Sequence, residues 1–128
     1  MNRKPLVYIA GPISIGDQFQ NVRNAMDTWD AMQASGIEAF CPHWSVLQQM
    51  HKGRGYEFWI EYCFRILSRC DAVYRMPGES VGGDAEVELA RFIGLPVFYD
   101  HEWGKLVDWN CDLCERGEEI GRPGQGTL

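Results

Sequence analysis

Short apolar runs alternate along the chain with segments whose apolar residues recur every three or four positions. The runs end at turn residues such as Gly11-Pro12 and Pro77-Gly78; they are Leu6–Ala10, Ile37–Cys41, Asp71–Met76 and Leu95–Tyr99. Such runs are typical of buried strands, and the intervening spacing is typical of amphipathic helices. Strands that alternate with helices of this length form right-handed βαβ units around a parallel sheet. The pattern therefore predicts a small doubly wound α/β fold, flavodoxin-like or Rossmann-like, with four to five parallel strands flanked by helices.

The expected helices follow from where each periodic pattern begins and ends. The first carries apolar residues from Val22 to Met32 and stops at Ser35-Gly36; the others are Tyr56–Cys70, Asp84–Ile93 and a weaker one at Trp103–Glu119. Residues 42–55 show no period, and we interpret them as a long loop of the kind that often carries function. The Gly-rich residues 120–128 are typical of a flexible tail. We expect a single domain over residues 1–119.

Composition excludes several classes of function. The 128 residues hold 12 Lys and Arg against 18 Asp and Glu, a net charge of −6. This balance offers no broad basic surface to a phosphate backbone, so we expect no nucleic acid polymer as a partner. No apolar run approaches the ~20 residues that span a bilayer, and the apolar stretch after the N-terminus is too short for a secretory signal. We expect an intracellular, cytoplasmic protein with no membrane partner.

The five cysteines favour reduced thiols over disulfides or metal ligands. They are an odd number, and two lie inside apolar periodic segments. Cys111 and Cys114 form a lone C-x-x-C, but no second Cys or His pair follows at a spacing that would complete a zinc site. We therefore expect no metal and no cofactor.

The fold class predicts where a ligand binds. In open parallel sheets the site lies beyond the carboxyl ends of the strands, where the strand order reverses. In so short a chain that point lies between the first and third strands. The loops Gly11–Asp17 and Pro77–Gly83 follow these strands, and their Gly, Pro and Ser residues let backbone amides approach a small ligand.

One carboxylate falls where solvation does not explain it. In a helix that starts near Gly83, Glu86 shares a stripe with Leu89, Ala90 and Ile93, which places it on the face toward the sheet. In the first turn it would also be stabilised as an anion by the helix dipole, as suits a nucleophile or a base. A capping-box carboxylate, bonding back to the helix start, is an equal alternative.

A neighbouring carboxylate has an ordinary explanation. Glu88 shares a face with Asp84 and Arg91, and can pair with Arg91 in water. Glu88 is therefore a natural comparison for Glu86.

Several motifs together resemble the nucleoside 2-deoxyribosyltransferase family, most closely its small uncharacterised branch. They are VYIAGPIS, Asn21, the Pro42-His43 pair and the block RCDAVYRMPGESVGGDAEVELARFIGLPV. The resemblance covers roughly residues 5–100. Within the block, the residues at the family's spacing are Asp71, Gly78, Ser80, Gly82, Glu86, Ala90 and Gly94-Leu95-Pro96.

The resemblance implies cleavage of an N-glycosidic bond through a glycosyl ester on Glu86, with the sugar then passing to another base or to water. Tyr8 matches a family tyrosine that lies close to the nucleophile, and its phenol would orient Glu86. The implied partner is a nucleoside or nucleotide. The resemblance also implies a homodimer or larger homo-oligomer whose neighbouring subunit completes the pocket. The implied substrate-binding residues are Gly11, Pro12, Ser14, Asn21, His43, Gly78, Ser80, Gly82 and Gly83.

One departure from the family concerns the general acid. Where the transferases carry an Asp eight residues before Asp71, this chain has Cys63, and a thiol with an ordinary pKa near 8.5 is a poor acid. The candidates left open are Asp71, Tyr62, His43 and a ligand-bound water. We assign Asp71 a catalytic role with Glu86 and Tyr8, and note that the ordinary pKa of histidine, near 6.5, suits an acid.

A second departure concerns Ser80, where transferases tend to carry an Asp. Relatives that hydrolyse 2'-deoxynucleoside 5'-monophosphates have a Ser there that helps to bind phosphate. A hydroxyl beside Gly82 and Gly83 at a helix start fits such an anion, and the same hydroxyl can also act as a helix N-cap. The alternative to an enzyme is a non-catalytic nucleotide-binding module of the same fold.

The aromatic residues divide into two groups. Trp29 and Trp59 have the helical spacing of core residues. Trp44, Tyr56 and Phe58 flank the irregular segment, and we weigh stacking on a base or closure over the site against a solvated, mobile loop.

Overall fold

The sheet is four-stranded and all-parallel, as expected for an α/β fold. The computed structural model describes residues 3–116. Its strands lie in the order β2-β1-β3-β4, with bounds β1 Leu6–Ala10, β2 Glu38–Phe40, β3 Ala72–Arg75 and β4 Val97–Tyr99. β1 therefore has a neighbour on each side, with Tyr8 paired to Phe40 of β2 and to Val73 of β3.

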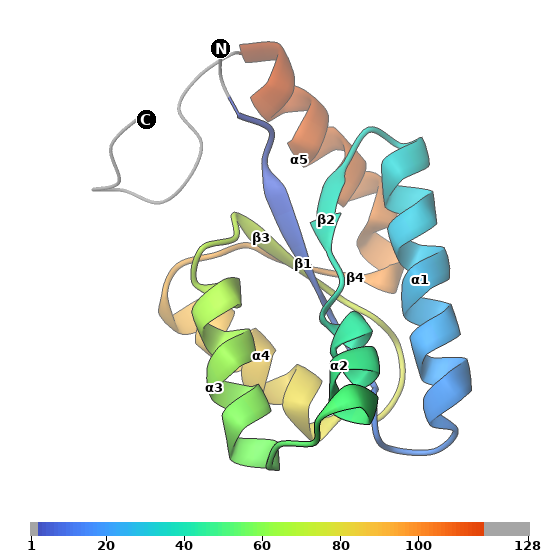
Figure 1. Ribbon diagram of the computed structural model, residues 1–128. Helices are drawn as coiled ribbons and strands as arrows, with labels where there is room; N and C mark the ends of the chain where they lie inside the picture. Colours follow the sequence, from blue (N-terminus) through green and yellow to red (C-terminus); the bar gives the residue numbers. More distant parts are fainter. Residues whose placement is uncertain (1–2, 117–128) are drawn as a thin grey trace.

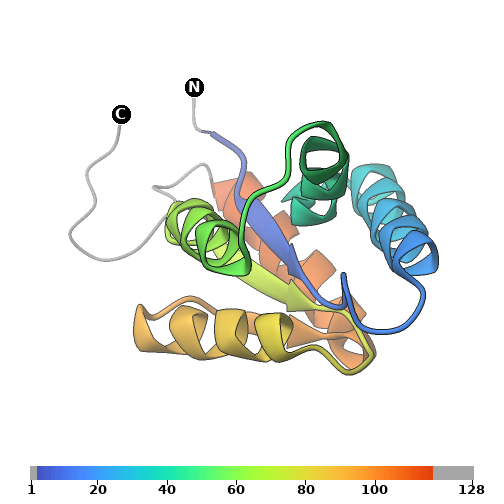
Figure 2. The ribbon, with the colours of Figure 1, turned by 60° about the horizontal axis from the view of Figure 1, so that its bottom comes forward.

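Helices cover both faces of this sheet (Figures 1 and 2). α1 (Gln18–Ala34) and α5 (Trp103–Arg116) pack on one face, and α3 (Tyr56–Leu67) and α4 (Val81–Phe92) pack on the other. Three short helical segments complete the described chain: η1 (Pro42–Trp44), α2 (Ser45–His51) and η2 (Asp100–Glu102). The doubly wound arrangement predicted from the alternation of patterns is confirmed.

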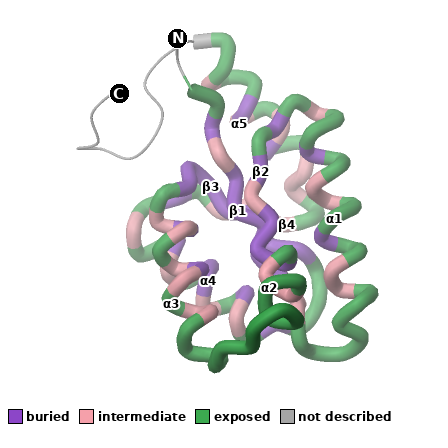
Figure 3. Tube along the Cα trace, viewed as in Figure 1, coloured by how far each residue is buried: buried purple, intermediate pink, exposed green. Residues whose placement is uncertain are grey.

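β1 shows how the period of two in a strand divides its residues between the two cores. Val7 and Ile9 join the cluster beneath α1 and α5, whereas Tyr8 and Ala10 join the cluster beneath α3 and α4. All four are fully buried, and the tube in Figure 3 shows β1 and β3 as largely buried. The phenol of Tyr8 is thus directed toward α3 and α4.

The segment 42–55 is not the long irregular loop that we expected. Pro42 opens the short helix η1, where its missing N–H is tolerated, and α2 follows directly. Val46, Leu47 and Met50 of α2 do have helical spacing, but the helix is only seven residues long and none of its residues is buried. So short a pattern does not distinguish a helix from a loop, which explains why we did not predict it.

α4 begins at Val81, three residues before the expected start at Asp84. Ser80 is its N-cap, and the Ser80 hydroxyl oxygen accepts a hydrogen bond from the Gly83 N–H at 2.9 Å. The capping role weighed for Ser80 is therefore confirmed.

The described residues include only part of the C-terminal region for which we made predictions. α5 is described as far as Arg116, so the expected extension to Glu119, the domain boundary there and the flexible tail 120–128 lie outside the described residues. Among residues 3–116 no helix has the length and apolar character needed to cross a bilayer.

Candidate active site

A pocket lies beyond the carboxyl ends of β1 and β3, where the strand order reverses. From β1 the chain leads through α1 to β2 on one side, whereas β3 pairs with β1 on the other. The pocket has a volume of about 540 Å³. Its walls are the loop after β1, the helix α2, and the first turns of α3 and α4.

Glu86 lines this pocket and is held there by Tyr8. Its side chain comes from the sheet-facing side of α4 and is 7% exposed. The Tyr8 hydroxyl donates a hydrogen bond to a Glu86 carboxylate oxygen across 78 positions of sequence. Burial of Tyr8, followed by the charge of Glu86, raises the Tyr8 pKa well above its usual value, so the phenol keeps its proton and stays a donor.

The ionisation expected for Glu86 needs correction. Burial raises its pKa to about 7, although the Tyr8 hydrogen bond and the nearby charge of Arg75 both lower it. Glu86 lies beyond the first turn of α4, so proximity to the helix start does not set its charge. The capping-box alternative also fails, because Ser80 makes the cap and Glu86 bonds to Tyr8. Glu86 is therefore partly protonated at neutral pH.

Cys63 shares the pocket with this pair. The thiol comes from α3, is buried, and lies near both Tyr8 and Glu86. Burial raises the pKa of Cys63 to about 11. Cys63 is thus an uncharged thiol at neutral pH.

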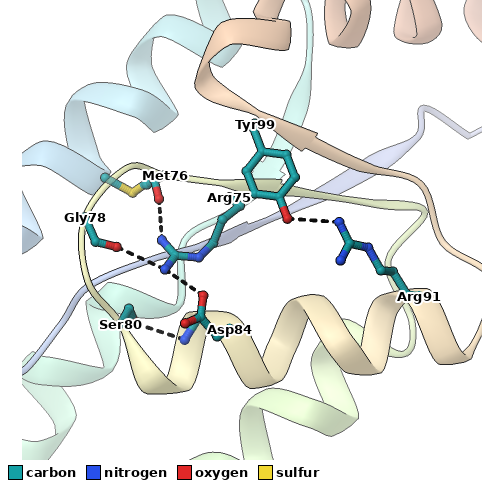
Figure 4. A network of polar contacts seen from close by, with 8 residues as sticks. Arg75, Met76, Gly78, Ser80, Asp84, Arg91 and Tyr99 are labelled. Atoms are coloured by element: carbon teal, nitrogen blue, oxygen red, sulfur yellow. Dashed lines mark hydrogen bonds and ion pairs between the residues drawn. The ribbon is translucent and has the colours of Figure 1, made fainter.

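Arg75 organises the loop between β3 and α4, and sequence reasoning missed it (Figure 4). It donates hydrogen bonds to the carbonyls of Met76 and Gly78, the latter at 3.0 Å, and pairs with Asp84 at 3.0 Å. A Cβ on Gly83 would lie only 3.1 Å from the Arg75 Nε, so this glycine makes room for the guanidinium. The available signal was a charged residue that ends the otherwise apolar β3.

Two predicted binding residues shape the loop after β1. The Asn21 amide donates to the carbonyls of Ile13 at 3.0 Å and Ile15 at 2.7 Å. The His43 Nε2 donates to the Pro12 carbonyl at 3.0 Å, since a carbonyl can only accept. These hydrogen bonds fix the conformation of the loop that lines the pocket.

His43 is not the acid that we considered. It is fully buried and does not line the pocket, and burial lowers its pKa to about 4. Its imidazole is neutral at physiological pH, and its one N–H is bonded to Pro12. Sequence spacing could not reveal this burial.

Of the nine predicted binding residues, eight line one or the other of two neighbouring cavities, and His43 is buried outside both. Gly11, Ser14, Ser80, Gly82 and Gly83 line the pocket of Glu86. Pro12, Asn21 and Gly78 line a smaller cavity of about 290 Å³, which shares Ile15 with the first. His43 lines neither.

Asp71 lies at the opposite edge of the sheet, so its predicted catalytic role is wrong. It precedes β3, and its carboxylate takes two hydrogen bonds from Arg3, at 2.7 and 3.0 Å, and one from the Leu6 N–H at 2.8 Å. The amino end of a parallel strand is the end away from the ligand. Asp71 therefore fastens the N-terminal segment to the sheet.

The first turns of α3 give the pocket an aromatic wall. Tyr56, Trp59 and Ile60 line it, so Trp59, which we expected in the core, is a half-buried pocket residue. Trp44 instead packs edge-on against Trp29, with ring centroids 5.6 Å apart. Phe58 lies outside this wall, beneath the guanidinium of Arg54.

Comparison with known proteins places the chain in a family. Residues 5–99 match the family model described as "Domain of unknown function (DUF4406)". The chain belongs to this family. The DUF4406 domain contains all four strands and every pocket-lining residue, and α5 follows it. No curated protein matches the sequence.

Among solved structures, the DUF4406 fold is similar to a 2-deoxyribosyltransferase from the psychrotolerant bacterium Bacillus psychrosaccharolyticus. The two share 20% sequence identity with a TM-score of 0.56, over 73% of this chain and 70% of the other. This likeness shows a shared fold.

Proposed function

We propose that this DUF4406 domain cleaves the N-glycosidic bond of a 2'-deoxynucleoside or its 5'-monophosphate, with Glu86 as the nucleophile. The observation that carries the proposal is the carboxylate of Glu86, buried in a pocket at the switch point of the sheet and bonded to Tyr8. Burial raises the cost of the carboxylate charge, and attack on an electron-poor carbon removes that charge. The shared fold with a 2-deoxyribosyltransferase supports the same assignment.

The proposed reaction takes place in two steps, formation and breakdown of a glycosyl ester on Glu86. In the first, a Glu86 carboxylate oxygen forms a bond to the anomeric carbon while the bond from that carbon to the base nitrogen breaks. The base leaves with the electron pair and takes up a proton. In the second, water or another base attacks the same carbon, Glu86 is released as a carboxylate, and the proton of the attacking group passes to solvent. Tyr8, which donates to one carboxylate oxygen, orients Glu86 through both steps.

We further propose that water supplies the proton to the leaving base. Asp71 and His43 lie outside the pocket, and Tyr62 stacks on Phe58. Besides Glu86, the acidic side chains lining the pocket in the described chain are the Tyr56 phenol and the Cys63 thiol. The raised pKa of Cys63 makes its thiol a poor proton donor at neutral pH.

The polar and aromatic walls suggest how a nucleotide lies in the pocket. The Ser80 hydroxyl and the Gly82 backbone, at the start of α4, form an anion-binding corner for a 5'-phosphate, since the Gly83 N–H already donates to Ser80. The Tyr56 and Trp59 rings offer stacking area to the base. A Ser80→Asp variant should therefore shift preference from monophosphates toward nucleosides, because a carboxylate repels phosphate.

We also propose that the chain acts in the cytoplasm as a homo-oligomer. Ile15, in the loop after β1, and Val81, at the start of α4, are exposed apolar residues of the pocket lining. A second copy that covers these two residues and leaves α2 uncovered would remove their apolar area from water and complete the pocket.

The competing candidate is a module that binds nucleotides without turnover. The observation that favours it is Cys63, an uncharged thiol in the pocket where the family resemblance implies an acid. The test is incubation with a panel of deoxynucleosides and their 5'-monophosphates, with and without acceptor bases, followed by chromatography of released base. Release supports the enzyme. Nucleotide binding with no release from any substrate would establish the module instead.

A further inference from the structure

The helix α2 forms one wall of the pocket but is weakly attached to the rest of the fold. It contributes Ser45, Val46, Gln49 and Met50 to the lining, yet none of its residues is buried. Residues 47–58, from α2 into the first turn of α3, form an unbroken exposed stretch (Figure 3). The segment just before α2 is different, because Pro42 and His43 of η1 are buried. α2 is thus anchored at its start and free of core packing along its length.

One side chain ties α2 to α3. The Gln49 Oε1 accepts hydrogen bonds from the Trp59 indole N–H at 2.5 Å and from the Arg54 backbone N–H at 2.9 Å. Two donors on one oxygen fix the orientation of the amide. Gln49 and Trp59 both line the pocket, so this junction closes the wall between the two helices.

The connection between α2 and α3 contains two glycines, Gly53 and Gly55, which differ in how closely they approach Gln49. A Cβ on Gly53 would lie 3.2 Å from the Gln49 Nε2, whereas a Cβ on Gly55 would meet nothing within 4 Å. Neither glycine has the positive φ that disfavours other residues. An added methyl group at position 53 therefore presses on Gln49, and one at position 55 does not.

We propose that α2 is a hinged lid of the pocket and that Gln49 is its latch. In the latched state Gln49 bridges Arg54 and Trp59 and the wall is closed. When both hydrogen bonds break, α2 swings on η1 and opens the pocket to the ligand. Segments with few buried contacts are those that open locally at low free energy. Only the identity of the ligand rests on the proposed function; the latch is a property of the free protein.

Trypsin tests the latch without any ligand. Lys52 and Arg54 are exposed cleavage sites in the connection, and the Arg54 N–H is part of the latch. In Gln49→Met, cleavage after these residues should rise roughly tenfold, since each hydrogen bond favours the closed state by a factor of about 2 to 13 and cleavage follows the open population. Gln48→Met, on the same helix, is the matched control and should be cut at the wild-type rate.

A second pair of variants tests the junction from the other side. Gly53→Ala should increase cleavage in the connection, because its methyl group lies 3.2 Å from the Gln49 Nε2 and the amide must shift to relieve this close contact, and Gly55→Ala should not. Mass spectrometry of the first fragments locates each cut. If Gln49→Met and Gln48→Met are cleaved equally fast, or the two glycine variants behave alike, Gln49 is not a latch.

Ligand protection separates the lid from the function. A deoxynucleoside 5'-monophosphate that the protein cleaves should slow trypsin at Lys52 and Arg54, because the ligand lies beneath the closed lid. Base release without any such protection would overturn the lid. Failure of every nucleotide to bind or react would overturn the proposed function, and the comparison of Gln49→Met with Gln48→Met still decides the latch.

Discussion

At the scale of single residues, the environment of Glu86 decides what it does. Its position on the sheet-facing stripe of α4 was predictable, because helical spacing places residue 86 with Leu89 and Ala90. Its ionisation was not, since burial beneath Tyr8 depends on a strand 78 positions away. Glu88, by contrast, is exposed as expected. The hydrogen bond shown for Arg91, its expected partner, goes to the Tyr99 hydroxyl at 3.0 Å.

The raised pKa of Glu86 predicts the pH dependence of base release. Only the carboxylate form attacks, so kcat/KM should rise with pH around 7 and then level off. A Tyr8→Phe variant should move this rise to higher pH, because the Tyr8 hydrogen bond lowers the pKa of Glu86. The measurement is kcat/KM from pH 5 to 9. A bell-shaped profile with a falling limb below pH 9 would show a protein acid that the proposed mechanism lacks.

The same pKa predicts a pH-dependent effect on stability. Glu86 has a higher pKa in the folded chain than in the unfolded chain, so its favourable contribution is complete below about pH 4.5 and is lost as pH rises through 7. Glu86→Gln removes this loss, so its free energy of unfolding at pH 8 should exceed that of wild type by up to about 3 kcal/mol. The measurement is urea unfolding of both proteins. The advantage should disappear near pH 4. Glu88→Gln, at an exposed position, should show no comparable pH-dependent change.

At the scale of elements, the start of α4 and its link to β3 carry most of the site. Ser80 is a recognisable N-cap residue, but the roles of Gly82 and Gly83 follow from contacts that sequence does not show. Gly83 makes room for Arg75, and Gly82 faces open space. α2 was not predicted because a seven-residue helix with no buried residue is too short for its apolar spacing to be recognised.

The two glycines give a matched prediction. Gly83→Ala should destabilise the fold by about 1–3 kcal/mol, because the methyl group crowds the Arg75 guanidinium and the Ser80 oxygen. Gly82→Ala should instead stabilise it by roughly 0.5–1 kcal/mol through helix propensity. Urea unfolding of both variants at one pH checks the signs. Equal destabilisation would indicate that Arg75 does not need the space at position 83.

At the scale of the whole molecule, alternation of strand and helix patterns was sufficient to predict the sheet and a pocket at the carboxyl ends of β1 and β3. It was not sufficient to place individual polar residues at one edge or the other. Asp71 and Glu86 are only 15 positions apart in the sequence, yet Asp71 precedes β3 and Glu86 follows it. The strand between them carries the two carboxylates to opposite edges of the sheet.

The position of Asp71 predicts that its substitution lowers the free energy of unfolding but leaves kcat unchanged. Asp71→Ala should lower stability by about 2–3 kcal/mol, because the variant removes a buried acceptor of charged and backbone hydrogen bonds. The kcat of the folded fraction, measured well below the melting temperature, should match wild type. A selective fall in kcat at full folding would return Asp71 to the reaction.

The central claim is that Glu86 attacks the sugar, and the most direct test compares two neighbouring glutamates on α4. Base release is measured for Glu86→Gln and Glu88→Gln with the best deoxynucleoside or monophosphate substrate, after circular dichroism confirms that both variants fold. Glu86→Gln should lose at least about a thousandfold in kcat, as expected when a nucleophile is removed, and Glu88→Gln should remain within about twofold of wild type. Similar activity in the two variants would contradict the assignment of Glu86.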